Sequence, residues 1–296
     1  MFKNRKPTII VITCFLLILS SFFSSCGGKA PAETTPALTF KACEHEPSDW
    51  IVDREPTLEN TGSAHIECIH CGFVLEFKSS PALSLSQEAI YEKLKPSLVK
   101  VVAYFDGNKE DYSQGSGFFI DSKGTFITNA HVVENCTYVT ITDYTGKEYE
   151  VDLLISYEYK DSIMYNDFAI LRASKCTNSH PVEFAMDANP GDTVFTIGFP
   201  LGVDNPFIDQ GIVIDLSYLN CILTDCYTAP GSSGGILTDD KGRVLGMTSL
   251  IIETHDTTYQ YTLKNKMFLD ALEYDILSAK SPLEYFYPDG IPEQIQ

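Results

Sequence analysis

From residue 84 onward the chain is a series of short apolar runs separated by turn signals. Runs such as Leu98–Phe105 and Val244–Ile252 are rich in Val, Ile, Phe, Tyr and Thr, the residue types that favour strands. Polar segments that end in glycine, such as Asp121–Gly124 and Asp239–Gly242, mark tight turns between them. About a dozen short strands of this kind predict an all-β domain, built as a sandwich or a barrel.

Two segments interrupt this pattern with helical spacing. Gln87–Leu94 is preceded by Ser84 and Ser86, either of which suits an N-cap, and is followed by Pro96. We therefore expect a short helix there. Leu263–Leu277 predicts one closing amphipathic helix after the last strand.

The first 25 residues have the pattern of a signal peptide. Three basic residues lie within the first six positions, and Thr8–Phe23 is almost wholly apolar but short for a spanning helix. Cys26 follows two serines and resembles the lipidated cysteine of bacterial lipoproteins, with an ordinary cleaved signal or an uncleaved anchor as the alternatives. We expect residues 26–39, rich in Ala, Pro, Thr and Gly, to be a lipid-anchored tether that holds the protein at the bacterial cell membrane, facing outside the cytoplasm.

Residues 40–78 hold a cluster of cysteines and histidines. The Cys68-Ile-His-Cys71-Gly72 turn directs two thiolates at one point, and Cys43 with His45 would complete a tetrahedral Cys₃His site. The segment resembles small zinc-ribbon-like modules, and so short a segment needs a staple to fold. We expect a structural zinc ion, with a Cys–Cys bridge as the alternative. Four protein ligands leave no open position for catalysis.

Four further cysteines lie in the large domain: Cys136, Cys176, Cys221 and Cys226. Outside the cytosol disulfides are chemically allowed, and four cysteines permit three connectivities that the sequence does not choose among. Free buried thiols are the other possibility. The formal net charge of −19 excludes a nucleic-acid partner, because no surplus of Lys and Arg is present to neutralise phosphates.

Three motifs in the β-rich region carry a catalytic pattern. They are Ile127-Thr-Asn-Ala-His131-Val-Val, Asn166-Asp167-Phe-Ala-Ile-Leu171 and Ala229-Pro-Gly231-Ser-Ser233-Gly-Gly235. A serine hydroxyl becomes a nucleophile when a neutral imidazole takes its proton, and a buried carboxylate orients that imidazole. Each motif alone is weak, but together they predict nucleophilic catalysis by Ser233 with His131 and Asp167.

These motifs resemble those of trypsin-like serine proteases, most closely the HtrA/Deg branch. Three outer stretches are similar too: Gly115-Ser-Gly-Phe-Phe-Ile, Ile197-Gly-Phe-Pro-Leu-Gly202 and Leu245-Gly-Met-Thr-Ser. The resemblance spans about residues 84 to 277. It implies a protease domain over residues 84–278 with a double six-stranded β-barrel and a C-terminal helix, followed by a tail over 279–296. The stretch after the last motif is too short for a PDZ domain, so none is expected.

The resemblance also implies a role for each site residue. Ser233 is the nucleophile, His131 the general base and then acid, and Asp167 the orienting carboxylate. The backbone of Gly231, Ser232 and Ser233 forms the oxyanion hole, and no cofactor takes part in catalysis. The expected substrate is a protein or peptide, and the oligomeric state is open.

Two further interpretations concern the substrate preference and the activity of the domain. Tyr227 stands six residues before Ser233 and offers no carboxylate to a basic side chain, so we expect a small aliphatic residue before the cleaved bond. The competing interpretation is a catalytically silent barrel that binds protein. A lipase or esterase is disfavoured, because those hydrolases run in the order Ser, Asp, His.

Overall fold

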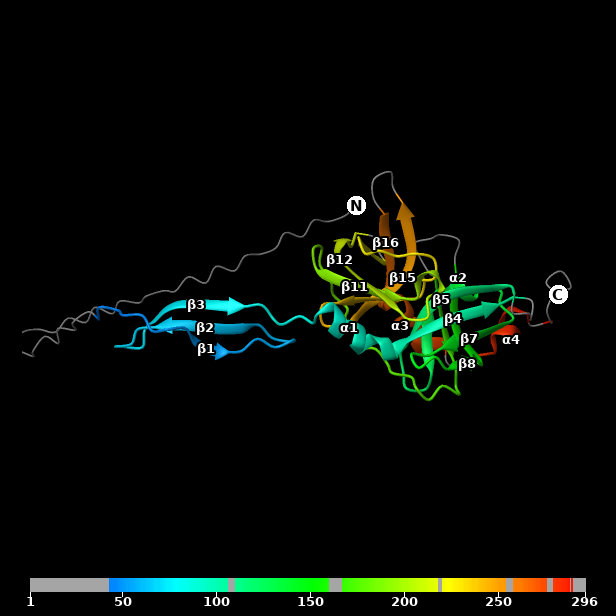
Figure 1. Cartoon of the computed structure of the whole chain (residues 1–296), viewed down its shortest axis with the longest axis horizontal. Coiled ribbons are helices and arrows are strands. Elements are labelled where there is room, and N and C mark those ends of the chain that lie inside the picture. The colour runs from blue at the N-terminus through cyan, green and yellow to red at the C-terminus, as the bar shows by residue number, and fades with distance from the viewer. Residues whose placement is uncertain are drawn as a thin grey trace, which may run out of the picture.

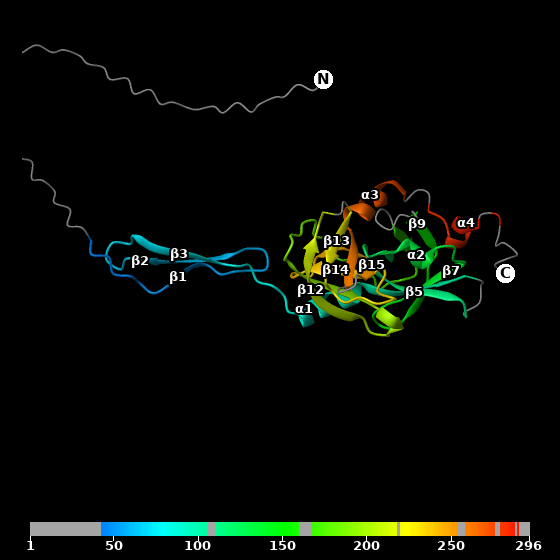
Figure 2. The ribbon, with the colours of Figure 1, turned by 90° about the horizontal axis from the view of Figure 1, so that it is seen from above.

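The computed structural model describes residues 43–105, 110–159, 167–217, 220–253, 258–275, 279–287 and 289. The predicted signal peptide, Cys26 and the tether lie outside these residues. Figures 1 and 2 show a slender N-terminal module that projects from a two-lobed body. Within the described ranges, no helix is long and apolar enough to cross a membrane.

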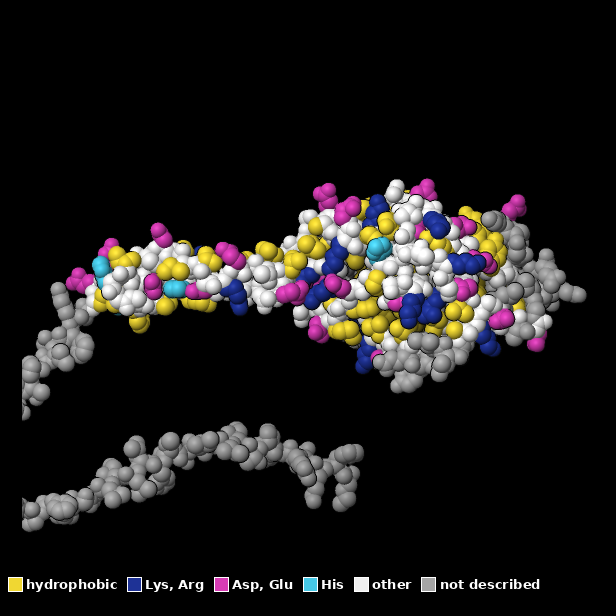
Figure 3. Space-filling model, turned by 90° about the horizontal axis from the view of Figure 1, so that it is seen from below, with side chains coloured by type: hydrophobic (Ala, Val, Ile, Leu, Met, Phe, Trp, Pro, Cys, Tyr) yellow, Lys and Arg dark blue, Asp and Glu magenta, His cyan; other side chains and the backbone are white. Residues whose placement is uncertain are grey.

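The N-terminal module is an antiparallel sheet of β1 (Ile51–Arg54), β2 (Gly62–Glu67) and β3 (Val74–Ser80), with β2 in the centre. Hydrophobic side chains lie along its surface (Figure 3), and Phe77 is 65% exposed. Among the described residues of the module, the buried apolar side chains are those of Ala64 and Cys68. A sheet that buries so little apolar surface needs a cross-link, such as a metal ion or a disulfide, to be stable.

The short helix predicted over Gln87–Leu94 is confirmed as α1. Of the two candidate caps, Ser86 is the one used, and its hydroxyl accepts a hydrogen bond from the backbone N–H of Ala89. Ile90 and Leu94 are buried on the face that packs against the lobes. A single 3₁₀ turn, η1 (Lys95–Ser97), leads from the helix into the first lobe.

The first lobe is a seven-stranded antiparallel sheet in the order β8-β7-β4-β5-β6-β10-β9. Its strands are β4 (Leu98–Tyr104), β5 (Tyr112–Phe119), β6 (Thr125–Thr128), β7 (Tyr138–Thr142), β8 (Glu148–Glu150), β9 (Leu153–Tyr159) and β10 (Asp167–Arg172). A six-stranded barrel was expected here. The described residues form a longer sheet because the short strand β8 adds an edge next to β7.

The second lobe confirms the predicted six-stranded barrel, closed in the order β11-β12-β13-β16-β15-β14. Its strands are β11 (Thr193–Gly198), β12 (Phe207–Asp215), β13 (Cys221–Thr224), β14 (Ile236–Asp239), β15 (Val244–Glu253) and β16 (Thr258–Lys264), and a 3₁₀ turn, η2 (Pro200–Gly202), follows β11. The apolar run in the sequence begins at Gly211, whereas β12 begins at Phe207, because the pairing with β11 includes Asp209 and Gln210, which interrupt the apolar pattern.

Alternation along β10 ties the lobes together. Phe168 and Ile170 point into a core shared by both lobes, whereas Ala169 and Leu171 point into the core of the first lobe. Both faces of the strand are therefore buried, which explains why its sequence is continuously apolar. This burial fixes the position of Asp167, the first residue of β10.

The closing helix α3 (Lys266–Asp275) begins later than predicted, because Leu263 and Lys264 still pair within β16, and the predicted end at Leu277 lies outside the described residues. Its Phe268 is fully buried and contacts Phe118 and Phe168 of the first lobe edge-on, with ring centroids 6.2 and 6.4 Å apart. A further short helix, α4 (Pro282–Phe286), lies in the segment expected to be a tail. Its five residues are too few to show a helical period.

The four cysteines of the large domain are buried free thiols. Burial raises the pKa of Cys136 to about 12 and that of Cys226 to about 12. A thiol with so high a pKa remains protonated and behaves as a small apolar side chain. Of the alternatives left open by the sequence, the structure has the free thiols.

Candidate active site

His131 lies at the point where β6 ends and the chain turns. Asn129 occupies the N-cap position of α2 (Ala130–Val133) without a side-chain capping bond, and this single helical turn carries His131 as its second residue. Val132 and Val133 are buried, which anchors this turn in the first lobe. The His131 side chain is 33% exposed to solvent.

The carboxylate of Asp167 accepts two hydrogen bonds from His131. Oδ2 of its carboxylate lies 2.7 Å from Nδ1 of His131, and Oδ1 accepts the backbone N–H of His131 at 3.0 Å. The amide of the fully buried Asn129 also donates to the backbone carbonyl of Asp167, at 2.8 Å. Because a carboxylate only accepts, Nδ1 is the donor, and Nε2 of the neutral ring is left as the acceptor.

The pKa of Asp167 lies below its ordinary value. Burial acts to raise it, but the hydrogen bonds and charge of His131 and the hydroxyl of Ser249 outweigh burial. Asp167 is therefore ionised at neutral pH. A buried anion in this place stabilises positive charge on His131 when the ring takes a proton.

Ser233 lies on the loop between β13 and β14 and is linked to Asp167 through Ser249 of β15. The Ser233 hydroxyl contacts the carbonyl oxygen of Ser249 at 3.5 Å, and Oγ of Ser249 donates to Oδ2 of Asp167 at 2.8 Å. The structure thus brings His131, Asp167 and Ser233 to one place. The hydrogen bonds of the described residues do not include one from Ser233 to His131, and such bonds commonly tighten only with substrate.

Backbone N–H groups of the same loop divide into two sets. Those of Ser232, Gly234 and Gly235 donate to other carbonyls of the protein. Among the described residues, those of Gly231 and Ser233 have no acceptor. Two such donors near a nucleophile suit an oxyanion hole, whereas the N–H of Ser232 is directed elsewhere, to Ala229.

Two glycines shape this loop. Gly231 and Gly234 have φ values of +97° and +86°, which side chains rarely adopt. A Cβ at Gly231 would lie 2.6 Å from the carbonyl oxygen of Phe199, and one at Gly234 would collide with the carbonyl oxygen of Ser116. The loop can therefore pack against both lobes only with glycine at these positions.

Sequence reasoning missed two polar residues of the site. Asn129 stood inside a quoted motif, and Ser249 ended another, but neither has a local pattern that reveals its bond to Asp167. Tyr227, which stands six residues before Ser233, is 54% exposed and packs its ring against Phe207 at 6.0 Å. The expected small aliphatic residue before the cleaved bond stays a prediction.

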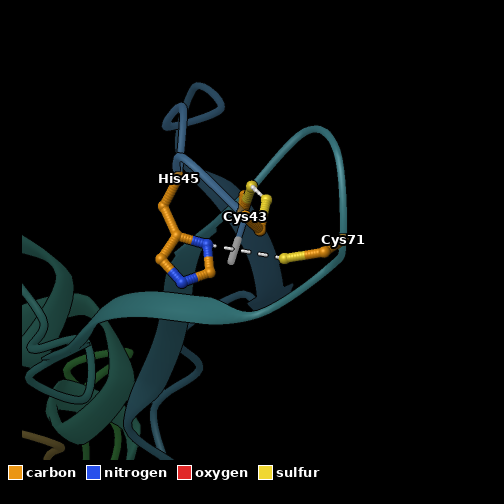
Figure 4. Close-up of side chains that lie close together, drawn as sticks. Cys43, His45 and Cys71 are labelled. Atoms are coloured by element: carbon orange, nitrogen blue, oxygen red, sulfur yellow. Dashed lines mark hydrogen bonds between the residues drawn. The ribbon is translucent and has the colours of Figure 1, made fainter. Parts of the chain in front are cut away.

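The four predicted metal ligands also lie together, with Cys68 and Cys71 in or next to the turn between β2 and β3. This turn is at the end of the module away from the lobes (Figure 1). Their ligand atoms are all within 4.8 Å of one another. Sγ of Cys43 and Cys68 are 3.6 Å apart, and Sγ of Cys71 lies 3.5 Å from Nδ1 of His45, toward which it points in Figure 4. Ligands of tetrahedral zinc with Zn–S bonds of about 2.3 Å are about 3.8 Å apart, so the cluster fits this ion.

The low pKa of Asp167 predicts a pH-dependent stability. The ionised carboxylate stabilises the folded state at neutral pH, and this contribution is lost as pH falls below the ordinary Asp value and through the lower folded pKa. Asp167→Asn should lower the thermal midpoint at pH 7, and its gap from wild type should shrink between about pH 5 and pH 3. Thermal melts across pH test this; a gap that stays constant in acid would contradict it.

Comparison with known proteins finds a matching family model and similar proteins. Residues 115–247 match the family model of the trypsin-like peptidase domain. The chain is 30% identical over 212 residues to the serine protease Do-like HtrA of Bacillus subtilis, covering 61% of this chain and 45% of that protein. It is 32% identical over 183 residues to the anti-sigma-I factor RsgI9 of Acetivibrio thermocellus, covering 58% of this chain and 25% of that one.

A solved structure agrees in fold. The active form of the Rv3671c protease from M. tuberculosis matches with a TM-score of 0.56 and 25% identity, over 66% of this chain and 89% of that one. The chain thus spans less than half the length of the two curated relatives above. Residues 115–247 thus match a trypsin-like peptidase domain, and the chain is similar to the HtrA/Deg serine proteases.

Proposed function

We propose that the protein is an extracytoplasmic serine endopeptidase that hydrolyses peptide bonds of proteins or peptides through an acyl-enzyme on Ser233. The observation that carries this proposal is the chain of contacts from His131 through Asp167 and Ser249 to Ser233. Two N–H groups that have no acceptor among the described residues lie in the same loop as the serine hydroxyl. Together they supply the base, the nucleophile and the anion site that peptide hydrolysis needs.

The reaction follows from the positions of these groups. Nε2 of His131 takes the proton of the Ser233 hydroxyl while Oγ bonds to the carbonyl carbon of the substrate. The N–H groups of Gly231 and Ser233 bind the oxyanion, and Asp167 stabilises the imidazolium. His131 then returns its proton to the leaving amine, and the C–N bond breaks to leave an ester on Ser233. Water, activated by His131, hydrolyses this ester.

Labelling by a fluorophosphonate probe tests the nucleophile. Wild type should react covalently, whereas Ser233→Ala should not, and His131→Ala should react more slowly by a factor of about a hundred or more. Ser217→Ala, which alters an exposed serine outside the site, should label like wild type. A folded wild type that remains unlabelled, even with unfolded protein present, would favour the silent protein-binding barrel.

We further propose that Cys43, His45, Cys68 and Cys71 hold a structural zinc ion. The support is the spacing of the four ligand atoms and the scarcity of buried apolar side chains in the module. His65 and His70 are engaged elsewhere, since His65 pairs with Asp53 at 2.7 Å and His70 with Glu46 at 2.9 Å. A zinc ion there cross-links the N-terminal end of the module to the turn between β2 and β3.

Elemental analysis of the purified full chain tests this zinc site. Wild type should carry about one zinc ion per chain, and His45→Ala should lose most of it because a ligand is removed. His70→Ala is the matched control, since His70 lies in the same module but outside the cluster, and it should keep the metal. A metal-free wild type with a Cys43–Cys68 disulfide would refute the proposal.

The location is a separate proposal, which rests on residues 1–39. A basic start, an apolar run and Cys26 after small residues support a lipid anchor at the bacterial cell membrane, with the folded lobes outside the cytoplasm. A single acylated cysteine would tether the whole chain. The lobes would then meet their protein substrates near the membrane surface.

Cell fractionation tests the anchor. Wild type should sediment with membranes, and Cys26→Ser should shift the protein to the soluble fraction because the acylated thiol is gone. Cys14→Ser, within the apolar run, is the matched control and should remain with the membranes. Soluble wild-type protein with an unmodified Cys26 would rule out lipid anchoring.

A further inference from the structure

Ser116 is a fully buried serine of β5 that lies beneath the loop of Ser233. Its hydroxyl donates to the carbonyl oxygen of Gly231 at 2.8 Å and accepts the backbone N–H of Phe199 at 2.9 Å. Its backbone N–H donates to the carbonyl oxygen of Ser233 at 2.7 Å. One residue of the first lobe thus holds two carbonyls of the nucleophile loop in the second.

The direction of the Ser116 hydroxyl is fixed by its partners. The N–H of Phe199 uses the oxygen as an acceptor, so the hydroxyl proton is free for Gly231. The same segment also holds the preceding peptide, because the N–H of Leu201 donates to the carbonyl oxygen of Pro230 at 2.6 Å. Both peptide groups that flank the α-carbon of Gly231 are therefore anchored.

This anchoring matters because Gly231 has no side chain to restrict its rotation. Glycine visits left-handed and right-handed backbone regions with little preference, so the loop itself does not select φ +97°. A carbonyl held inward by Ser116 prevents the loop from turning that oxygen into the place of the oxyanion. The N–H groups of Gly231 and Ser233, which have no acceptor among the described residues, then remain available to substrate.

We propose that Ser116 is a positioning residue that sets the oxyanion hole through the carbonyl of Gly231, without touching the substrate. The inference rests on the proposed peptidase function and adds a residue from outside the three motifs. Removing the hydroxyl would leave the carbonyl of Gly231 and the N–H of Phe199 without a partner in a buried place. The loop would relieve this by rotating at Gly231.

Steady-state kinetics on a peptide substrate test the role. Ser116→Ala should lower kcat by about tenfold to a hundredfold with KM changed less than about twofold, because the oxyanion forms only in the transition state. Ser116→Cys, which keeps a weak donor, should fall between the two. Affinity for a peptide aldehyde, which places an oxygen in the oxyanion site, should fall with kcat, while affinity for the cleaved product peptide should not.

A second variant displaces the same hydroxyl without deleting it. A Cβ at Gly198 would lie 2.8 Å from Oγ of Ser116, and the backbone there does not require glycine. Gly198→Ala should therefore lower kcat as Ser116→Ala does. The double variant should be no worse than the poorer single one, because both changes break one interaction.

Thr238→Val is the matched structural control. Its buried hydroxyl donates to the carbonyl oxygen of Arg243 at 2.8 Å, in β14 and away from the site, so its loss should lower the thermal midpoint but leave kcat near wild type. Equal kcat in Ser116→Ala and wild type would overturn the inference alone. A wild type that neither cleaves peptides nor binds the aldehyde would overturn the proposed function, and this inference with it.

Discussion

The site depends on one buried carboxylate that the two lobes share. Asp167 begins a strand of the first lobe, yet Oδ2 of its side chain accepts a hydroxyl from Ser249 in the second. Without its three donors the carboxylate would be costly to bury, because burial alone disfavours its charge. The Ser249 hydrogen bond therefore couples the carboxylate that orients His131 to the packing of the two lobes.

Much of the fold follows from local sequence signals. The helix over Gln87–Leu94 was predicted with its bounds because a serine cap and a following proline mark both ends. Strand β10 was predicted to within a residue because its four consecutive apolar positions face two cores. The Cys/His cluster was found from spacing alone, since a Cys-x-x-Cys-Gly turn limits where its ligands point.

Other features depend on contacts that no local pattern records. Ser249 meets Asp167 across 82 residues of sequence, and Ser116 meets Gly231 across 115. A serine in a strand looks the same whether it faces solvent or a catalytic carboxylate. The sequence from Glu148 to Ile155 predicts a single strand, whereas the structure divides it into β8, which pairs with β7, and β9, which pairs with β10.

The cysteine thiols of the lobes and those of the N-terminal module differ in how accessible they are to an oxidant. Among the described residues, the four thiols of the two lobes are buried and held protonated, and no bridge joins them. The stability of the lobes is thus indifferent to the redox potential of the surroundings. In the N-terminal module, by contrast, Cys71 is exposed and Cys43 partly so. An oxidant would react with the N-terminal module first and leave the peptidase domain intact. Oxidation of the module therefore need not unfold the peptidase domain.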